Sequence, residues 1–326
     1  MSTLSTDTDL ITELNQHGAL SLGTWAFGGN QWGGEQSDAD SFASMATAVE
    51  AGLTHFDTAG GYGGGHSEKL IGEFLRSDPA AKSKVFVASK VFPKPNADAE
   101  FAYNGVCKSL ERMGLDQIDL YYLHWPRNDM DLREPLKGLE RAREEGLIRY
   151  VGVSNFNVEQ LEQGLEVSRI EAHQFCYNLI WRLPEQAVLP FCQHHGIASV
   201  TYSSIAQGVL TGKFGASPAF QEGDARAKTV IFEPEVWPKV HAAIEQLKGV
   251  AKDACRPLTH LAIRWVAAQQ GVNSVLVGAR NVDQVAANAA AAAGDIDPNV
   301  FARMTAISDQ LAADLPAVTN LWRNEF

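Results

Sequence analysis

The chain has 326 residues, of which 45% are hydrophobic and 20% charged, which suits one large α/β barrel or two ordinary domains. Its formal net charge of −12 disfavours a nucleic-acid or anionic-membrane surface, because both need clustered Lys and Arg. The acidic, polar N-terminal segment lacks the basic and apolar regions of a signal peptide, and no stretch approaches the roughly 18 uncharged apolar residues of a membrane span, so we expect a cytoplasmic protein.

The N-terminal segment predicts a hairpin and then a helix. Apolar residues at 10–14 and 19–22 flank a turn, a pattern that indicates a small β-hairpin, or a lid, before the first core strand. Asp38 is the predicted N-cap of a helix that Gly52 ends, because apolar residues recur between them at helical spacing.

The next stretch places two titratable groups beside one space. A short apolar strand ends at Asp57, and Tyr62 follows among five glycines, where little local packing can hold a phenol ring. An Asp in turn hydrogen bonds and a surface Tyr would explain this stretch equally well. Ser67 is the predicted N-cap of the next helix, with Glu68 as an acid in its first turn.

From here strands and helices alternate regularly. The further predicted strands are 85–90, 118–123, 150–153, 172–175, 197–202 and 274–277. The predicted helices are 101–113, 132–145, 158–167, 185–195, 236–253, 258–269, an alanine-rich helix containing 286–294, and 300–315.

This alternation predicts a fold class. Counting from residue 19 gives eight strands, each but one followed promptly by a helix, so the sheet is expected to be parallel and built from right-handed units. Eight units favour a closed (β/α)₈ TIM barrel, with an N-terminal β-hairpin and extra C-terminal helices, over an open sheet. No GxGxxG follows a strand, which argues against a Rossmann domain. We find no linker and expect residues 1–326 to form a single domain.

Four candidate catalytic side chains stand at successive strand ends. In such a barrel the active site lies at the C-terminal ends of the strands, so Asp57, Lys90, His124 and the nearby Tyr62 are expected to converge. The four suit hydride transfer to a carbonyl, in which negative charge builds on oxygen and a donor must deliver a proton. Lys90 would favour the phenolate of Tyr62, Asp57 would hold Lys90 charged, and His124 would orient the carbonyl oxygen or help to relay the proton.

At these residues the chain resembles the aldo-keto reductase superfamily over essentially its whole length. The matching motifs are HFDTAGGYGGGHSE at 55–68, Lys90 after VFVAS, His124 in YYLHWP, GVSNF at 152–156, YSSIAQGVLTGK at 202–213 and GARNVDQVAAN at 278–288. The opening WAFGGNQWGG and the GARN element are more similar to bacterial general-stress members and potassium-channel β subunits than to aldose reductase. The resemblance implies an NADP(H)-dependent enzyme that reduces aldehydes or ketones, or oxidises alcohols, with Tyr62, Asp57, Lys90 and His124 as catalytic residues.

The resemblance also implies where the cofactor binds. Around the nicotinamide we expect Gly23, Thr24, Trp25, Asp57, Ser154, Asn155, Gln174 and Tyr202, with Tyr202 stacked on the ring. Along the pyrophosphate we expect Ser203, Ile205, Gln207, Gly208, Leu210 and Lys213. At the adenosine 2′-phosphate and adenine we expect Gly278, Ala279, Arg280, Gln284 and Asn288, where a helix N-terminus favours an anion.

The sequence departs from the family pattern at the phosphate-binding positions. Ile205 stands where the family often has proline, and Gly278 and Gln284 fall where many members carry Lys or Arg. Arg280 is left as the main charge there. The expectation is therefore NADP(H) as the preferred cofactor, with NAD(H) as a second one.

The seven tryptophans divide into two expected groups. The expected substrate-pocket residues are Trp25, Trp32, Trp125 and Trp322. The expected core or interface residues are Trp181, Trp237 and Trp265. The pocket group suits an apolar or aromatic aldehyde, and it suits a sugar as well; the partner is in either case a small carbonyl or alcohol. The oligomeric state stays open.

Other interpretations remain at this point. The chain could be a redox sensor that binds NADP(H) and turns over little, or Lys90 could be the Schiff-base lysine of a class I aldolase. Asp224 and Arg226, on the long loop after the seventh strand, are as well explained by a surface ion pair as by a clamp on the cofactor. No metal site is expected, because adjacent residues such as His194 and His195 point in different directions on a helix. The four scattered cysteines, without a CxxC pair, are expected to be reduced thiols.

Overall fold

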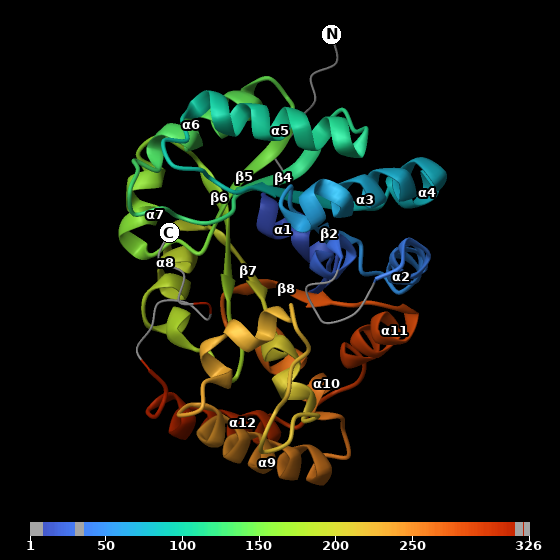
Figure 1. Cartoon of the computed structure of the whole chain (residues 1–326), viewed down its shortest axis with the longest axis vertical. Helices are drawn as coiled ribbons and strands as arrows, with labels where there is room; N and C mark the ends of the chain where they lie inside the picture. The colour runs from blue at the N-terminus through green and yellow to red at the C-terminus, as the bar shows by residue number, and fades with distance from the viewer. Residues whose placement is uncertain (1–8, 30–35, 317–321, 323–326) are drawn as a thin grey trace.

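The computed structural model describes residues 9–29, 36–316 and 322, and its strands close into a parallel barrel in which each pairs with the next and β8 pairs with β1 (Figure 1). The strands are β1 (Leu20–Gly23), β2 (His55–Asp57), β3 (Phe86–Val91), β4 (Ile118–Leu123), β5 (Ile148–Ser154), β6 (Ile170–Cys176), β7 (Ala198–Tyr202) and β8 (Val272–Gly278). The predicted barrel is confirmed, and each of its eight predicted strands overlaps one of these.

Helices surround this barrel. The α-helices are α1 (Leu10–Gln16), α2 (Asp38–Glu50), α3 (His66–Ser77), α4 (Pro79–Lys82), α5 (Ala99–Met113), α6 (Arg133–Glu144), α7 (Val158–Leu165), α8 (Val188–His195), α9 (Trp237–Asp253), α10 (Leu258–Ala267), α11 (Val282–Ala291) and α12 (Pro298–Ala312). The 3₁₀ turns are η1 (Trp25–Gly28), η2 (Tyr62–Gly65), η3 (Leu183–Gln186), η4 (Ala206–Thr211), η5 (Ala225–Lys228) and η6 (Val230–Phe232). The pair α9 and α12 packs together at the foot of Figure 1 and supplies the expected extra C-terminal helices. None of the helices in the described part of the chain is long and apolar enough to cross a membrane.

The strands are buried on both faces and separate two apolar clusters. On β4, Leu120 and Tyr122 belong to the cluster inside the barrel, whereas Tyr121 and Leu123 belong to the larger cluster between strands and helices. This alternation follows from the two-residue period of a strand. Gly152 on β5 makes room for the interior ring, because a Cβ there would lie 2.5 Å from Cδ1 of Tyr122.

The predicted N-terminal hairpin is wrong. Residues 10–16 form the helix α1, and its Leu10 and Leu14 pack into the interior cluster beside Phe86 and Tyr150 near the starts of β3 and β5. Two leucines four residues apart lie on one helical face, so the same apolar residues that suggested a strand form the apolar side of a short helix. The helix covers the N-terminal end of the barrel.

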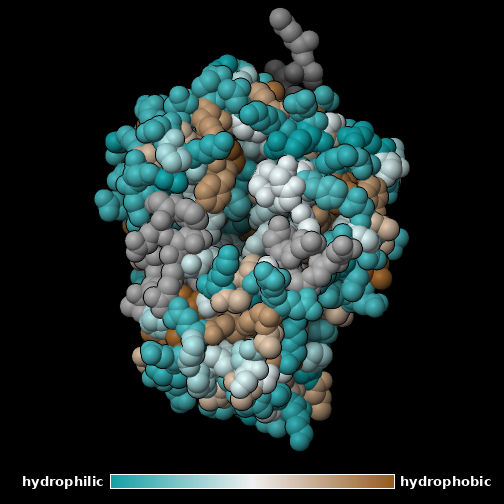
Figure 2. Space-filling view, viewed as in Figure 1, coloured by the Kyte–Doolittle hydropathy of each residue, from teal (hydrophilic) through white to brown (hydrophobic). Residues whose placement is uncertain are grey.

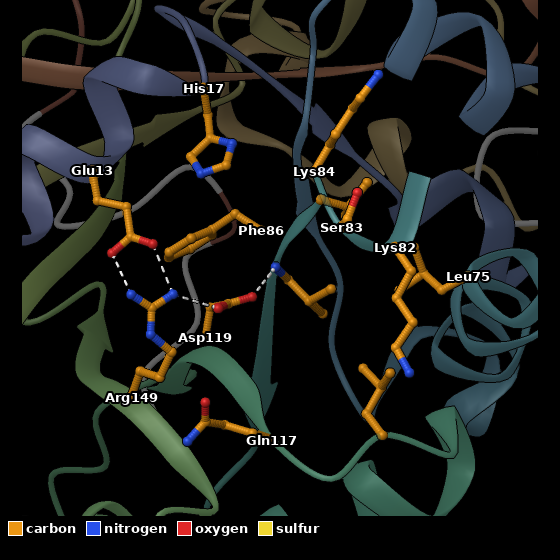
Figure 3. Close-up of a pocket in the computed structure, with 13 residues that line it drawn as sticks. Glu13, His17, Leu75, Lys82, Ser83, Lys84, Phe86, Gln117, Asp119 and Arg149 are labelled. Atoms are coloured by element: carbon orange, nitrogen blue, oxygen red, sulfur yellow. Dashed lines mark hydrogen bonds and ion pairs between the residues drawn. The ribbon is translucent and has the colours of Figure 1, made fainter. Parts of the chain in front are cut away.

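A network of charged groups fixes α1 in this place (Figure 3). The guanidinium of Arg149 donates to both carboxylate oxygens of Glu13 at 2.7 Å and to Asp119 at 2.7 Å, and Asp119 accepts from the backbone N–H of Val87. These groups line a cavity of about 280 Å³. In Figure 3 they point toward one another, whereas Lys82 and Lys84 extend away. The charges of this network are therefore paired within it, and the cavity lies at the opposite end of the barrel from the C-terminal strand ends.

Candidate active site

The structure brings Asp57, Tyr62, Lys90 and His124 together at the C-terminal end of the barrel. Nζ of Lys90 lies 2.5 Å from Oδ1 of Asp57 and 3.5 Å from the hydroxyl oxygen of Tyr62. The rings of Tyr62 and His124 meet edge to face, with centroids 5.9 Å apart. The space-filling view is hollowed near the middle of the same face as Figure 1 (Figure 2). The predicted convergence of the four side chains is thus seen in the geometry.

Lys90 is held as a buried ammonium. Besides Asp57, it donates to the backbone carbonyl of Thr58 at 2.7 Å, and its side chain is fully buried. Desolvation works against the charged form, but Asp57 and Tyr62 outweigh it and raise the pKa of Lys90. Gln174 donates to the other oxygen of Asp57 at 2.8 Å, so both carboxylate oxygens have a donor. Sequence reasoning did not find this link, because residues 57 and 174 lie 117 positions apart.

The hydroxyl of Tyr62 is a weak acid in this site. Burial raises the pKa of Tyr62, while the positive charge of Lys90 opposes the rise and that of Asp57 adds to it. The predicted effect of Lys90 therefore has the right sign, but burial is the larger effect, and the phenol keeps its proton at neutral pH.

His124 is a neutral imidazole. Burial and the nearby charge of Lys90 hold its pKa well below the ordinary value. Its Nδ1 is a buried atom without a hydrogen-bond partner among the residues that the structure describes. Phe92, two residues beyond Lys90, is partly exposed and lies edge-on to the His124 ring, with the ring centroids 5.8 Å apart. The sequence analysis missed this contact. The proximity of Phe92 to Lys90 in the sequence was the available signal.

Aromatic side chains stand beside Tyr62. The ring centroid of Trp25 lies 6.2 Å from that of Tyr62 and 5.8 Å from that of Trp322, so two of the four predicted pocket tryptophans meet beside Tyr62. Trp125 is half-buried directly after His124. Trp32 lies outside the described residues. By contrast, Trp181, Trp237 and Trp265 are buried in the large cluster, as predicted.

The residues expected at the nicotinamide form one hydrogen-bonded group. Asn155 adopts a left-handed backbone conformation, with φ of 64°, directly after β5. Its side-chain oxygen accepts from the Tyr202 hydroxyl at 2.7 Å, and its amide nitrogen donates to Ser154 and to the backbone carbonyl of His124. Most of its side-chain hydrogen-bonding capacity is therefore used within the protein. Asn155 therefore links the hydroxyl of Tyr202 to the backbone of His124.

Thr24 and Ser67 form buried hydrogen bonds at the same end of the barrel. The Thr24 hydroxyl donates to the backbone carbonyl of Asp57 at 2.8 Å, so it faces the protein. The prediction that Ser67 is an N-cap is wrong, because α3 begins one residue earlier and Ser67 is buried between Thr24 and Thr58. Gly23 pairs with Gly278 in the register of β1 and β8, which places two residues without side chains next to each other.

The segment after β7 has an unusual backbone. Ser203, Ala206, Gln207 and Gly208 all have positive φ, and Gln207 donates to the Ser203 hydroxyl at 2.6 Å. Non-glycine residues in this region are uncommon and cluster at ligand sites. Ile205 is half-buried and Leu210 is buried, so only the backbone of Leu210 is available to a ligand.

Three cations gather beyond this segment, although the chain as a whole is acidic. Burial lowers the pKa of Lys213, and the positive charges of Arg226 and Arg280 lower it further, while Asp224 opposes them. Asp224 and Arg226 form the ion pair at 2.5 Å, but the pair is largely buried and does not lie at the surface as that interpretation expected. This concentration of positive charge suits a phosphate group.

The remaining predicted residues lie between the end of β8 and the middle of α11. The side-chain oxygen of Gln284 accepts from the backbone N–H of Arg280 at 2.9 Å, so that this N–H is already paired. Asn288 is buried and donates to the carbonyl of Gly278 at 3.2 Å. Ala279, which directly follows Gly278, is also buried. A group of three or more metal-ligating side chains does not occur within the described ranges.

Comparison with known proteins identifies the family of this chain. The sequence model of the Aldo/keto reductase family matches residues 19–309. Aldo-keto reductase YhdN of Bacillus subtilis (strain 168) is 33% identical over 276 residues, which cover 82% of this chain and 83% of the relative. The NADH-specific methylglyoxal reductase of Escherichia coli (strain K12) is 31% identical over 293 residues, covering 83% and 89%. The solved structure of the glycerol dehydrogenase AKR11B4 from Gluconobacter oxydans superimposes with a TM-score of 0.78 at 29% identity, covering 91% of this chain and 92% of that one. The chain therefore belongs to the aldo/keto reductase family and is an oxidoreductase.

Proposed function

We propose that this protein transfers hydride between NADP(H) and a small aldehyde, ketone or alcohol, with Tyr62 as the general acid and base. The observation that carries the proposal is the position of the Lys90 ammonium, 2.5 Å from Asp57 and 3.5 Å from the hydroxyl of Tyr62. Bound nicotinamide would supply the hydride at C4. The chain's own residues must then deliver a proton to the carbonyl oxygen.

In the reducing direction, Tyr62 donates its proton as negative charge builds on the carbonyl oxygen. Lys90 stabilises the phenolate that remains, because an ammonium close to a phenolate lowers its free energy in a buried site. Asp57 keeps Lys90 charged and in place, and Gln174 keeps Asp57 in place. His124, neutral and edge-on to Tyr62, is suited to hydrogen-bond and orient the substrate oxygen.

The same geometry argues against a Schiff-base aldolase. A nucleophilic lysine needs a lowered pKa, so that a neutral amine is present near pH 7. Here the pKa of Lys90 is raised by Asp57 and Tyr62 against the effect of burial. An amine held as an ammonium cannot attack a carbonyl carbon.

The cofactor preference follows from charge. The positively charged Lys213, Arg226 and Arg280 lie where the phosphates are expected, which supports NADP(H) as the preferred cofactor with NAD(H) as a second one. The E. coli relative is NADH-specific, so family membership does not decide between them. The left-handed segment from Ser203 to Gly208 would bring backbone N–H groups close to the pyrophosphate.

The first experiment is NADPH oxidation with a panel of small aldehydes, comparing the wild type with Tyr62→Phe. We expect turnover in the wild type and a fall in kcat of about 10²- to 10⁴-fold in the variant, with NADPH binding retained. Tight NADPH binding without turnover of any aldehyde, ketone or sugar would favour a redox sensor. The absence of nicotinamide binding would refute both functions.

A further inference from the structure

An ion pair between the buried Glu68 and the partly exposed Arg112 lies beside the loop that carries Tyr62. Glu68, in the first turn of α3, is fully buried. One of its carboxylate oxygens accepts from the hydroxyl of Ser89 on β3 at 2.5 Å, and the other accepts from Nε of Arg112 on α5. Arg112 also donates to the Ser109 hydroxyl at 3.2 Å. A buried carboxylate is costly unless it is paired and hydrogen-bonded, so both donors are needed to keep Glu68 in this place.

Arg112 lies against both ends of the catalytic loop. A Cβ at Gly65 would lie 2.5 Å from Cδ of Arg112, and a Cβ at Gly60 would lie 2.9 Å from its Nη2. The backbone of the loop therefore touches the arginine side chain at the residues where it leaves the barrel and where it enters α3. Glycine at both positions permits this close contact.

The loop has few means of holding itself. Its 3₁₀ turn contains three consecutive glycines, and Gly63 touches Gly28 on the other side, where a Cβ would lie 2.1 Å from the Gly28 carbonyl oxygen. Residues without side chains cannot interlock with one another. The loop has backbone hydrogen bonds of its own, such as that from the N–H of Tyr62 to the Ala59 carbonyl at 3.0 Å. Neighbouring elements hold it further: Gly28 on one side, Arg112 on the other, and the Lys90 carbonyl, which accepts from the N–H of Gly60 at 3.0 Å.

We propose that Arg112 and Glu68 are positioning residues that set the place of the Tyr62 hydroxyl relative to Lys90; this inference rests on the proposed function of that site. Glu68 binds Ser89, which directly precedes Lys90 on β3, and Arg112 contacts the loop that carries Tyr62. One ion pair thus links the loop that carries Tyr62 to the strand that carries Lys90. Neither Arg112 nor Glu68 contacts the reacting atoms.

The test uses the double variant Glu68→Gln/Arg112→Met in the full chain. It removes both charges at once, so that no unpaired buried charge remains to unfold the protein. Turnover is measured with NADPH and 4-nitrobenzaldehyde, and the isotope effect on kcat is measured with [4,4-²H₂]NADPH. Hydrogen exchange of the peptide that contains Tyr62 reports on the loop without any turnover. Arg133→Met, which removes an exposed ion pair with Asp131 and Glu166, is the matched control.

A positioning role predicts a set of changes that lost stability alone does not produce. We expect kcat to fall about 10- to 100-fold, a larger isotope effect, faster exchange of the loop, and an NADPH Kd within about twofold of wild type. Arg112→Lys, which keeps the charge but not the flat guanidinium, should give an intermediate kcat. A lower kcat with an unchanged isotope effect and unchanged loop exchange would mean fewer active molecules and would overturn the proposal. If the wild type itself does not turn over, the proposed function fails. Hydrogen exchange of the loop then tests the positioning role by itself, and exchange in the double variant as slow as in the wild type refutes that role.

Discussion

At the scale of single residues, the main feature is that Lys90 bonds to its partners in a site shielded from solvent. Its side chain and that of Asp57 are almost completely buried, and each needs the other to remain charged. The lysine therefore contributes to the stability of the barrel as well as to the proposed acid–base chemistry. These two contributions can be separated by mutation.

Lys90→Met should lose activity and stability together. We expect kcat to fall at least about 10²-fold, because the phenolate of Tyr62 loses its stabilising charge. The free energy of unfolding should fall by about 3–5 kcal/mol, because Asp57 is left buried and unpaired. Urea denaturation and steady-state kinetics measure the two effects.

The double variant Asp57→Asn/Lys90→Met is the control for this interpretation. It leaves no unpaired charge, so most of the lost stability should return while kcat stays low. Recovery of kcat in the double variant, or no loss of stability in Lys90→Met, would contradict it.

Arg280→Met should change the cofactor preference. The variant removes one of three cations from the expected phosphate region, while the backbone N–H of residue 280 can still be capped by Gln284. We expect the KM for NADPH to rise about tenfold, since a charge-assisted hydrogen bond contributes roughly 1.5–3 kcal/mol, and the KM for NADH to change little. The ratio of kcat/KM for the two cofactors measures this, and equal losses with both would show that Arg280 does not read the 2′-phosphate.

At this scale the sequence predicts positions better than partners. The convergence of Asp57, Lys90 and His124 could be predicted because neighbouring parallel strands end at one edge. The bond from Gln174 to Asp57 and the contact of Phe92 with His124 could not, because each depends on the direction of a side chain across the barrel.

At the scale of elements, the joint between α1 and the barrel is separate from the active site. Arg149 joins Glu13 on α1 to Asp119 on β4, and the Tyr150 hydroxyl donates to Glu13 at 2.6 Å. All of these lie at the N-terminal end of the barrel. Changes there should affect stability and leave the chemistry unchanged.

Arg149→Met tests this separation. It leaves two partly buried carboxylates without their shared cation, and we expect the free energy of unfolding to fall by about 1–3 kcal/mol. The NADPH Kd and kcat should stay within about twofold of wild type. A urea midpoint equal to that of the wild type would show that Leu10 and Leu14 alone hold α1.

Elements could be predicted where the pattern within one segment decides the structure. Strand β4 has the predicted bounds because its apolar residues fill both faces of a buried strand. The helix α1 was missed because two leucines and a turn fit a hairpin locally, whereas the groups that hold the helix, such as Phe86 and Arg149, are distant in the sequence. Glu68 was expected only as an acid in the first turn of a helix. Its role in an ion pair could not be predicted, because its partner Arg112 lies 44 positions away.

At the scale of the whole molecule, two buried histidines couple the barrel to pH. His55 on β2 is bonded to Ser21 at 2.9 Å, and His173 on β6 accepts from the backbone N–H of Phe156 at 3.1 Å. Burial lowers the pKa of each to about 3. Both are therefore neutral in the folded protein at neutral pH.

Because the unfolded chain binds these protons near pH 6.5, the stability that the neutral histidines give is complete above that pH and is lost as the pH falls toward 3. At pH 5 the loss reaches about 2 kcal/mol for each histidine, since 1.5 pH units below 6.5 correspond to about that free energy. Urea denaturation between pH 7 and pH 5, a range that lies above most carboxyl titrations, measures this loss. In His173→Gln the decrease over this range should be about 2 kcal/mol smaller than in the wild type, because the pKa values of His55 and His124 remain lowered. A pH dependence in His173→Gln as steep as that of the wild type would show that other groups cause the acid sensitivity.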